Sequence, residues 1–150
     1  MKKFQFSLEK VLEIKEIEEK TIQKDLYLIQ KEISETENRI TNVKEKISYE
    51  RKNVATLSKN LSTTIDIMIH YKYIDGLTVE LQTLASNLLS LKEKEKVVKK
   101  KLIDKSKEKK ALEKLKEIKY EEFKKEYNKA QQISTDEVSI QNHRLKTGEV

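Results

Sequence analysis

The stretch LSKNLSTTID, residues 57–66, interrupts a helical pattern that runs through most of the chain. Half of its residues are serine, threonine or asparagine. Asn60 is suited to end a helix, because asparagine tolerates the left-handed conformation common at helix C-termini. Thr63 and Asp66 match the Ser/Thr-x-x-Asp/Glu pattern that begins a helix. A stop followed so closely by a start predicts a short turn between two antiparallel helices.

The residues before this turn carry an apolar stripe with the 3.5-residue spacing of a coiled coil. The stripe is Ile22, Leu26, Ile29, Ile33, Thr36, Ile40, Val43, Ile47, Glu50, Val54, Leu57 and Leu61. Leu8 and Leu12 hold the same spacing upstream, with Lys15 and Glu19 as polar steps. A stripe this narrow and this regular requires a partner helix.

A matching stripe follows the turn. It comprises Leu77, Leu81, Leu84, Leu88, Leu91, Glu95, Val98 and Leu102. Lys105 and Lys109 then interrupt the stripe, and Leu112 rejoins it. Farther on, a drifting stripe is expected at Leu115, Ile118, Phe123, Tyr127 and Ala130. Such drift indicates that the supercoil loosens or that the helix leaves its partner.

Two matching stripes on one chain predict an all-α fold, an antiparallel two-helix coiled-coil hairpin with a longer C-terminal helix. We expect a single domain over residues 1–150, with helix 1 at about 5–59 and the turn at about 59–62. Helix 2 is expected at about 63–134 or further, followed by a frayed tail to residue 150. One straight helix through the break is the alternative.

The composition excludes a compact enzyme core. The chain has no proline, no cysteine, no tryptophan and two glycines, and 39% of its residues are charged. Its histidines, His70 and His143, lie far apart, and no glycine motif could cradle a phosphate. We therefore expect no catalytic residue, no metal site and no cofactor. The chain also lacks an apolar run long enough for a membrane span or a secretory signal, which predicts a cytoplasmic protein.

The positive charge is concentrated in residues 92–129, which hold sixteen lysines and nine acidic residues. This segment is either a solvated coiled-coil face or a basic surface for an acidic protein. Nucleic acid is a weaker interpretation, because glutamates are interleaved and no aromatic stacking platform is present. Two general functions thus remain open: a helical-hairpin chaperone or holdase, and a nucleic-acid-associated coiled coil.

A second feature follows the turn, where MIHYKYIDGL, residues 68–77, is apolar and tyrosine-rich. Two helices cannot bury apolar groups on every side, so the segment either closes the end of the coiled coil or binds a partner. Gly76 costs helix stability, and it either admits another backbone or bends the helix.

Three stretches together resemble the FliJ family of flagellar type III export proteins. They are FQFSLEKVLEIKEIEEK at 4–20, HYKYIDGL at 70–77 and ALEKLKEIKYEEFKKEYNKAQQISTDEVSI at 111–140. The resemblance implies a non-enzymatic stalk, like the central stalk of rotary ATPases. Its implied partners are the hexameric flagellar export ATPase, the cytoplasmic domain of the export-gate membrane protein, and export chaperones that it escorts. It also implies a cytoplasmic protein peripherally associated with the inner membrane at the flagellar base.

Candidate contact residues follow from the same resemblance. The resemblance gives Tyr49, Tyr73 and Leu77 as gate candidates, and Tyr71 of the tyrosine-rich segment 68–77 is added to them. The ATPase candidates are the N-terminal aromatics and a basic stretch, namely Phe4, Phe6, Lys99, Lys100 and Lys101. Two further family positions fall on Glu80 and Leu84, where the family can have alanine and histidine. No small-molecule substrate is implied.

Overall fold

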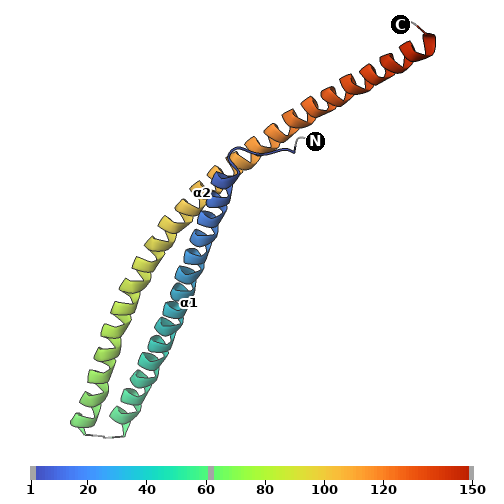
Figure 1. The fold of residues 1–150 in the computed structure, drawn as a ribbon. Helices are drawn as coiled ribbons and strands as arrows, with labels where there is room; N and C mark the ends of the chain where they lie inside the picture. Colours follow the sequence, from blue (N-terminus) through green and yellow to red (C-terminus); the bar gives the residue numbers. More distant parts are fainter. Residues whose placement is uncertain (1–2, 61–62, 149–150) are drawn as a thin grey trace. The chain divides into compact units, whose positions relative to one another are not determined.

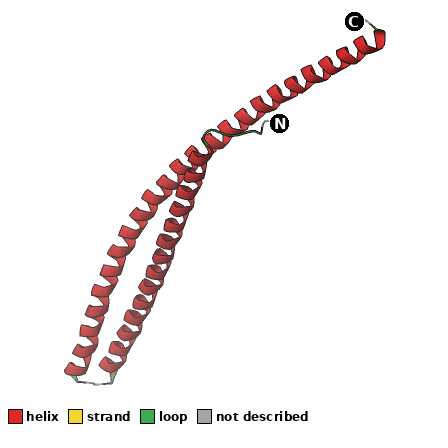
Figure 2. Ribbon diagram, in the orientation of Figure 1, coloured by secondary structure: helices red, strands yellow, loops and turns green. Residues whose placement is uncertain are grey.

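Two long helices make up nearly all of the structure, a computed structural model that describes residues 3–60 and 63–148. Helix α1 spans Glu9–Lys59 and helix α2 spans Thr64–Thr147. They run antiparallel beside each other (Figure 1), and no strand occurs in either described range (Figure 2). The prediction of an all-α antiparallel hairpin with a longer second helix is therefore confirmed.

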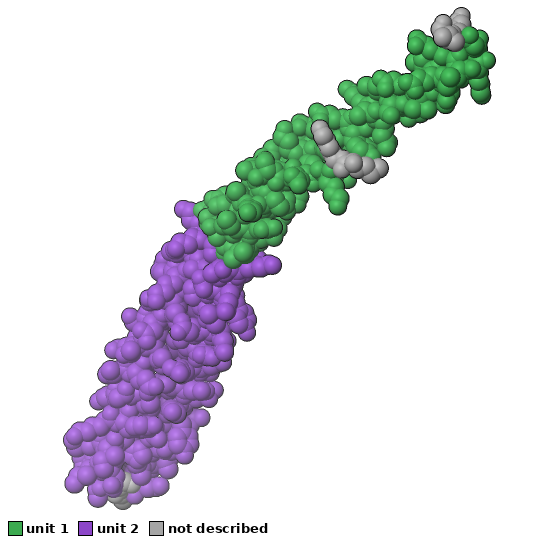
Figure 3. All heavy atoms as spheres, in the orientation of Figure 1, with its two compact units in different colours: residues 1–19, 104–150 green, residues 20–103 purple. Residues whose placement is uncertain are grey.

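The chain divides into two compact units (Figure 3). The turn unit comprises residues 20–103 and contains the turn between the helices. The terminal unit comprises residues 1–19 and 104–150, so it combines the two ends of the chain. The expectation of a single domain stays a prediction.

The turn unit is closed by the predicted apolar seam. Each predicted seam position from Ile22 to Leu57, and from Leu77 to Leu102, is buried or half-buried. Leu61, the last position of the first stripe, lies outside the described residues. The most buried residues form one cluster, namely Val43, Ile47, Val54, Ile74 and Leu77.

The flanks of the turn are capped by local hydrogen bonds. The Asn60 N–H donates to the carbonyls of Thr56 and Leu57, at 3.2 Å each, which closes the end of α1. At the start of α2, the Thr63 hydroxyl accepts from the Asp66 N–H at 3.4 Å and donates to the Asp66 carboxylate at 2.5 Å. Thr63 thus caps α2 as the sequence pattern predicts, with Asp66 bonded to the hydroxyl of the cap.

Helix α1 begins later than the expected residue 5. Its first α-helical hydrogen bond runs from the Leu12 N–H to the Leu8 carbonyl at 3.0 Å. The residues before it, 3–8, form a non-helical N-terminal arm whose Phe6 side chain is buried. The Phe4 ring of the arm packs on α2, and the arm stands in place of the first helical turn that the sequence pattern predicts.

Helix α2 continues to Thr147, through most of the segment that was expected to fray. Gly148 follows the helix, and its φ of 66° is the left-handed conformation that glycine adopts without strain. The drifting stripe was only partly right. Phe123 and Tyr127 are half-buried, but Leu115, Ile118 and Ala130 are exposed. Lys116 takes the next seam position, because it is four residues after Leu112.

Candidate functional site

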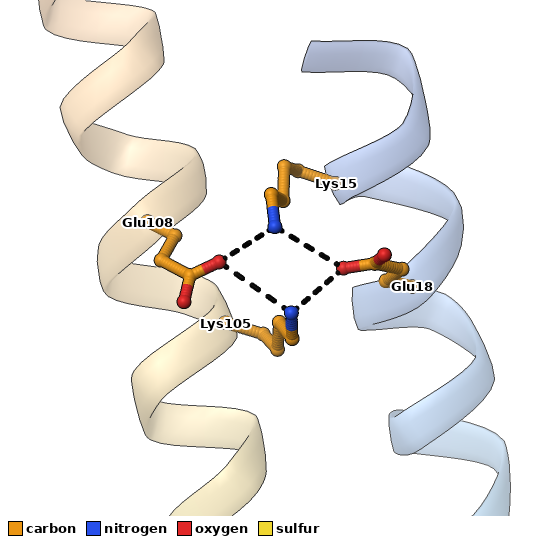
Figure 4. Close-up of polar contacts among 4 residues, drawn as sticks. All are labelled: Lys15, Glu18, Lys105 and Glu108. Atoms are coloured by element: carbon orange, nitrogen blue, oxygen red, sulfur yellow. Dashed lines mark ion pairs between the residues drawn. The ribbon is translucent and has the colours of Figure 1, made fainter. Parts of the chain in front are cut away.

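Four charged side chains close the seam of the terminal unit (Figure 4). Lys15 Nζ lies 2.8 Å from Glu108 Oε2 and 3.5 Å from Glu18 Oε2. Lys105 Nζ lies 2.9 Å from Glu18 Oε2 and 3.5 Å from Glu108 Oε2. Each ammonium group therefore contacts both carboxylates, and this ion-pair quartet joins α1 to α2.

Two further ion pairs bridge the same helices. Lys109 Nζ lies 3.0 Å from Glu19 Oε2, and Lys116 Nζ lies 2.7 Å from Glu9 Oε2. Glu19 is buried although it is charged. The polar steps that the sequence showed at Lys15, Glu19 and Lys109 are thus matched to partners across the seam.

The contacts stabilise the charged forms of the groups. The hydrogen bond from Lys105 lowers the pKa of Glu18, and the hydrogen bond from Lys15 lowers the pKa of Glu108. The hydrogen bond to Glu108 raises the pKa of Lys15, and the one to Glu19 raises the pKa of Lys109. Partial burial opposes each shift but is outweighed. Lys15, Glu18, Glu108 and Lys109 are therefore charged at neutral pH.

An aromatic cluster joins the N-terminal arm to α2. The Phe4 ring packs edge-on against Tyr120, with centroids 5.3 Å apart, and lies 5.6 Å from Phe123. Phe123 in turn stacks on Tyr127 at 6.1 Å. The two ATPase candidates of the arm are thus engaged within the chain. Phe6 is buried, whereas Phe4 stays partly exposed and lines an open groove of about 690 Å³ beside α2.

The turn unit brings two gate candidates together from different helices. Tyr49 of α1 and Tyr73 of α2 line one shallow groove, and their side chains are 64% and 49% exposed. Tyr71 is also exposed, outside the residues that line this groove. Leu77 is only 5% exposed and belongs to the core cluster, so its side chain is not available on this surface.

An aliphatic surface lies on the same part of α2. Its exposed members are Ile65, Met68, Ile69 and Val79. A Cβ built on Gly76 would meet no atom within 4 Å, so no described part of the chain approaches this glycine closely. The exposure of these residues favours a partner surface over a closed coiled-coil end.

Sequence reasoning missed a histidine–glutamate pair in the turn unit. The His70 Nδ1 atom lies 2.6 Å from Glu50 Oε2, and the Glu50 side chain is only 13% exposed. A signal was present, because His70 precedes Leu77 by seven residues and therefore continues the seam of α2.

The basic candidates of the turn unit lie on α2. Lys99 pairs with Glu95 at 3.0 Å on the same helix, and Lys100 and Lys101 are exposed. Glu95 also accepts a hydrogen bond from Gln30 of α1 at 3.1 Å. Lys99 is therefore partly neutralised within the chain, which leaves Lys100 and Lys101 as the stronger candidates for an acidic partner.

Within residues 3–60 and 63–148, no group of three or more potential ligands could hold a metal ion. Among the described helices, none is long and apolar enough to cross a membrane. The family model for the flagellar FliJ protein matches residues 4–148. The chain belongs to the FliJ family. No curated protein and no solved structure matches it.

Membership of the FliJ family confirms the resemblance seen in the sequence. It makes the chain a component of the flagellar type III protein-export apparatus, from a family of non-catalytic components.

Proposed function

We propose that this FliJ-family chain is a non-enzymatic stalk-like subunit that promotes the export ATPase ring and couples it to the export gate. It also escorts export chaperones, and it works at the cytoplasmic face of the inner membrane at the flagellar base. The observation that carries the proposal is the shared groove of Tyr49 and Tyr73. Two exposed tyrosines from different helices form a contact surface of the kind that dominates protein interfaces.

The tyrosine groove is the proposed contact with the cytoplasmic domain of the gate protein. Tyrosine offers a large contact area at a low cost in side-chain entropy. Lys46, Glu45 and Glu50 line the same groove and supply a polar rim of mixed charge. Leu77 supports this surface from within the core and does not contact the partner itself.

The gate contact is tested by titration calorimetry with the purified cytoplasmic domain of the gate protein. Tyr49→Ala and Tyr73→Ala should each weaken binding at least about fivefold, because hot-spot tyrosines contribute more than about 1 kcal/mol to an interface. Tyr27→Ala is the matched control, since Tyr27 is an exposed tyrosine of α1 in the same unit but outside the groove. Equal affinities for all three variants would rule out the groove as the gate contact.

The ATPase contact is proposed to involve the N-terminal arm and the basic stretch of α2. The arm supports this assignment because Phe4 remains partly exposed beside an open groove. Lys100 and Lys101 supply exposed positive charge for an acidic surface.

Purified protein should raise the turnover of the purified export ATPase while hydrolysing no ATP by itself. A Lys100→Ala/Lys101→Ala variant should need more protein for half-maximal stimulation, because exposed charges mainly govern association. Lys20→Ala/Lys24→Ala, which removes the same charge from an exposed part of α1, is the control. An absence of any stimulation, together with suppressed aggregation of unrelated unfolded proteins, would instead identify a general holdase.

A further inference from the structure

The two units differ in the contacts that dominate the seam between the helices, although the turn unit also has the cross-helix ion pair Lys92–Glu37. In the turn unit the seam is closed by buried aliphatic side chains, among them Val43, Ile47 and Leu77. In the terminal unit, seam positions of both helices are occupied by charged residues, among them Lys15 and Lys109. Exposed ion pairs contribute little to stability and are screened by salt, whereas apolar burial is not screened.

We propose that residues 9–19 of α1 and 104–116 of α2 form an electrostatic clasp that opens when its ion pairs are screened. Opening releases the first turns of α1 from α2. Helix α2 stays intact, because its own backbone hydrogen bonds do not depend on α1.

The charges of the clasp are matched across the seam. Its four described cross-helix lysine–glutamate pairs each join one helix to the other. The contacts are Lys15–Glu108, Glu18–Lys105, Glu19–Lys109 and Glu9–Lys116. Most of these side chains remain a quarter to a half exposed, so dissolved ions reach them.

Apolar contacts keep the clasp closed at rest. Leu12 is buried between the charged steps, and the N-terminal arm buries Phe6 and packs Phe4 against α2. Opening exposes these side chains, so it is a minor state at low salt. The clasp is therefore a local opening within the terminal unit and not an unfolding of the chain.

Hydrogen exchange of the full chain tests the clasp directly. The amides of residues 13–19 are compared with those of 43–57 at about 0.05 M and about 1 M NaCl, because the Debye length falls from above 10 Å to about 3 Å over this range. After correction for intrinsic rates, exchange in residues 13–19 should be at least about threefold faster at high salt. The salt-induced change in the exchange rate of residues 43–57 should be less than half of that in residues 13–19. Equal salt responses in the two segments would overturn the proposal.

A charge-reversal variant should reverse the direction in which added salt changes the exchange rate of residues 13–19. Helix fraying cannot produce such a reversal. Glu18→Lys places a third ammonium group beside Lys15 and Lys105, so low salt now favours the open state. In this variant, added salt should slow exchange in residues 13–19. The double exchange Glu18→Lys/Lys105→Glu keeps an ion pair across the seam and should restore the response of the unaltered chain. If added salt still accelerated exchange in the Glu18→Lys variant, the clasp would be contradicted.

A matched control separates the clasp from general surface charge. Lys119 pairs at 2.8 Å with Glu122 on the same helix and makes no cross-helix ion pair among the described residues. Lys119→Leu removes the same charge from the same unit, so it should leave the salt response of residues 13–19 unchanged. If Lys119→Leu abolished the response, the effect would belong to net charge, and the clasp would be wrong.

Discussion

One histidine–glutamate pair interrupts an otherwise apolar stretch of the turn unit. Glu50 is a member of the first predicted stripe, and His70 lies seven residues before Leu77 of the second. Their contact at 2.6 Å could not be predicted, because the alignment of the two helices depends on the exact length of the turn. A polar pair in an apolar seam favours one alignment over its neighbours, since a shifted alignment would leave both groups without a partner.

Removing both partners of this pair should cost less than the sum of the two single removals. Glu50→Leu or His70→Leu leaves the other polar group facing an apolar side chain, which should lower the free energy of unfolding by about 1–3 kcal/mol. The double variant should lose less than the sum of the two, with a coupling of at least about 0.5 kcal/mol. Urea unfolding followed by circular dichroism measures all four proteins. Strict additivity would show that the pair contributes nothing jointly.

Gly76 should limit the stability of α2 in the isolated protein. Glycine in a helix interior costs about 1 kcal/mol relative to alanine, and an added Cβ would meet no atom within 4 Å. Gly76→Ala should therefore raise the free energy of unfolding by about 1 kcal/mol. Ala85→Gly, at an exposed position of the same helix, is the reciprocal control and should lower it by a similar amount. A destabilised Gly76→Ala protein would mean that the helix is bent there for a reason that alanine disturbs.

The start of α1 shows where a pattern of local spacing fails. Leu8 and Leu12 continue the heptad spacing, which predicted helix from about residue 5. The arm instead leaves the helical path, with Phe4 packed on Tyr120 and Phe123 of α2 and with Phe6 buried. This contact joins residues more than a hundred positions apart, so helical periodicity carries no signal for it.

The aromatic arm should protect the part of α2 that it covers. Phe6→Ala removes a buried ring at the end of the fold, so we expect local loosening without global unfolding. Hydrogen exchange in residues 119–127 should increase several-fold, and Phe4→Ala should have a smaller effect because Phe4 is less buried. Gln5→Ala, at an exposed position between them, is the control. Unchanged exchange in Phe6→Ala would show that the arm does not hold α2.

The ion-pair quartet makes the closure of the terminal unit depend on pH. The folded pKa values of Glu18 and Glu108 are lowered, so their contribution to stability is present above the ordinary glutamate pKa and is lost as the pH falls through the folded values. The raised pKa of Lys15 gives a contribution that is present below the ordinary lysine pKa and is lost as the pH rises through the folded value. Closure should therefore be strongest between these limits.

Carboxyl carbon shifts in NMR spectra check this directly. The hydrogen bond from Lys105 contributes most to the lowered pKa of Glu18. Lys105→Met removes this hydrogen bond, so the titration midpoint of Glu18 should rise toward the ordinary glutamate pKa. Facing charges at Glu19, Lys109 and Glu113 stay in place in this variant. Lys119→Met is the control and should leave the Glu18 midpoint unchanged, because Lys119 pairs with Glu122. A Glu18 midpoint that ignores Lys105 would contradict the assigned contact.

The hairpin as a whole follows from two stripes and one break in the sequence. Apolar spacing predicted every described seam position from Ile22 to Leu57, because a 3.5-residue repeat leaves only one face to bury. Tyr49 and Tyr73 were both named as candidates from the sequence, but their shared groove was not predicted. Apolar spacing reports which residues are buried, so it says nothing about how two exposed side chains lie. The family resemblance supplied those residues, and the structure placed them together.

The antiparallel alignment brings Gln30 beside Glu95, and it can be tested in a chain that has no cysteine of its own. In a Gln30→Cys/Glu95→Cys variant, a short bismaleimide should join the two thiols within one molecule, with a yield that does not change on dilution. Lys72→Cys in place of Glu95→Cys is the control, because 23 helical residues separate the two positions by about 35 Å along α2. One straight helix that pairs only with other molecules would give cross-linked dimers whose yield falls on dilution. That result would rule out the intramolecular hairpin, and it would also rule out the seam between the helices that the groove and the clasp require.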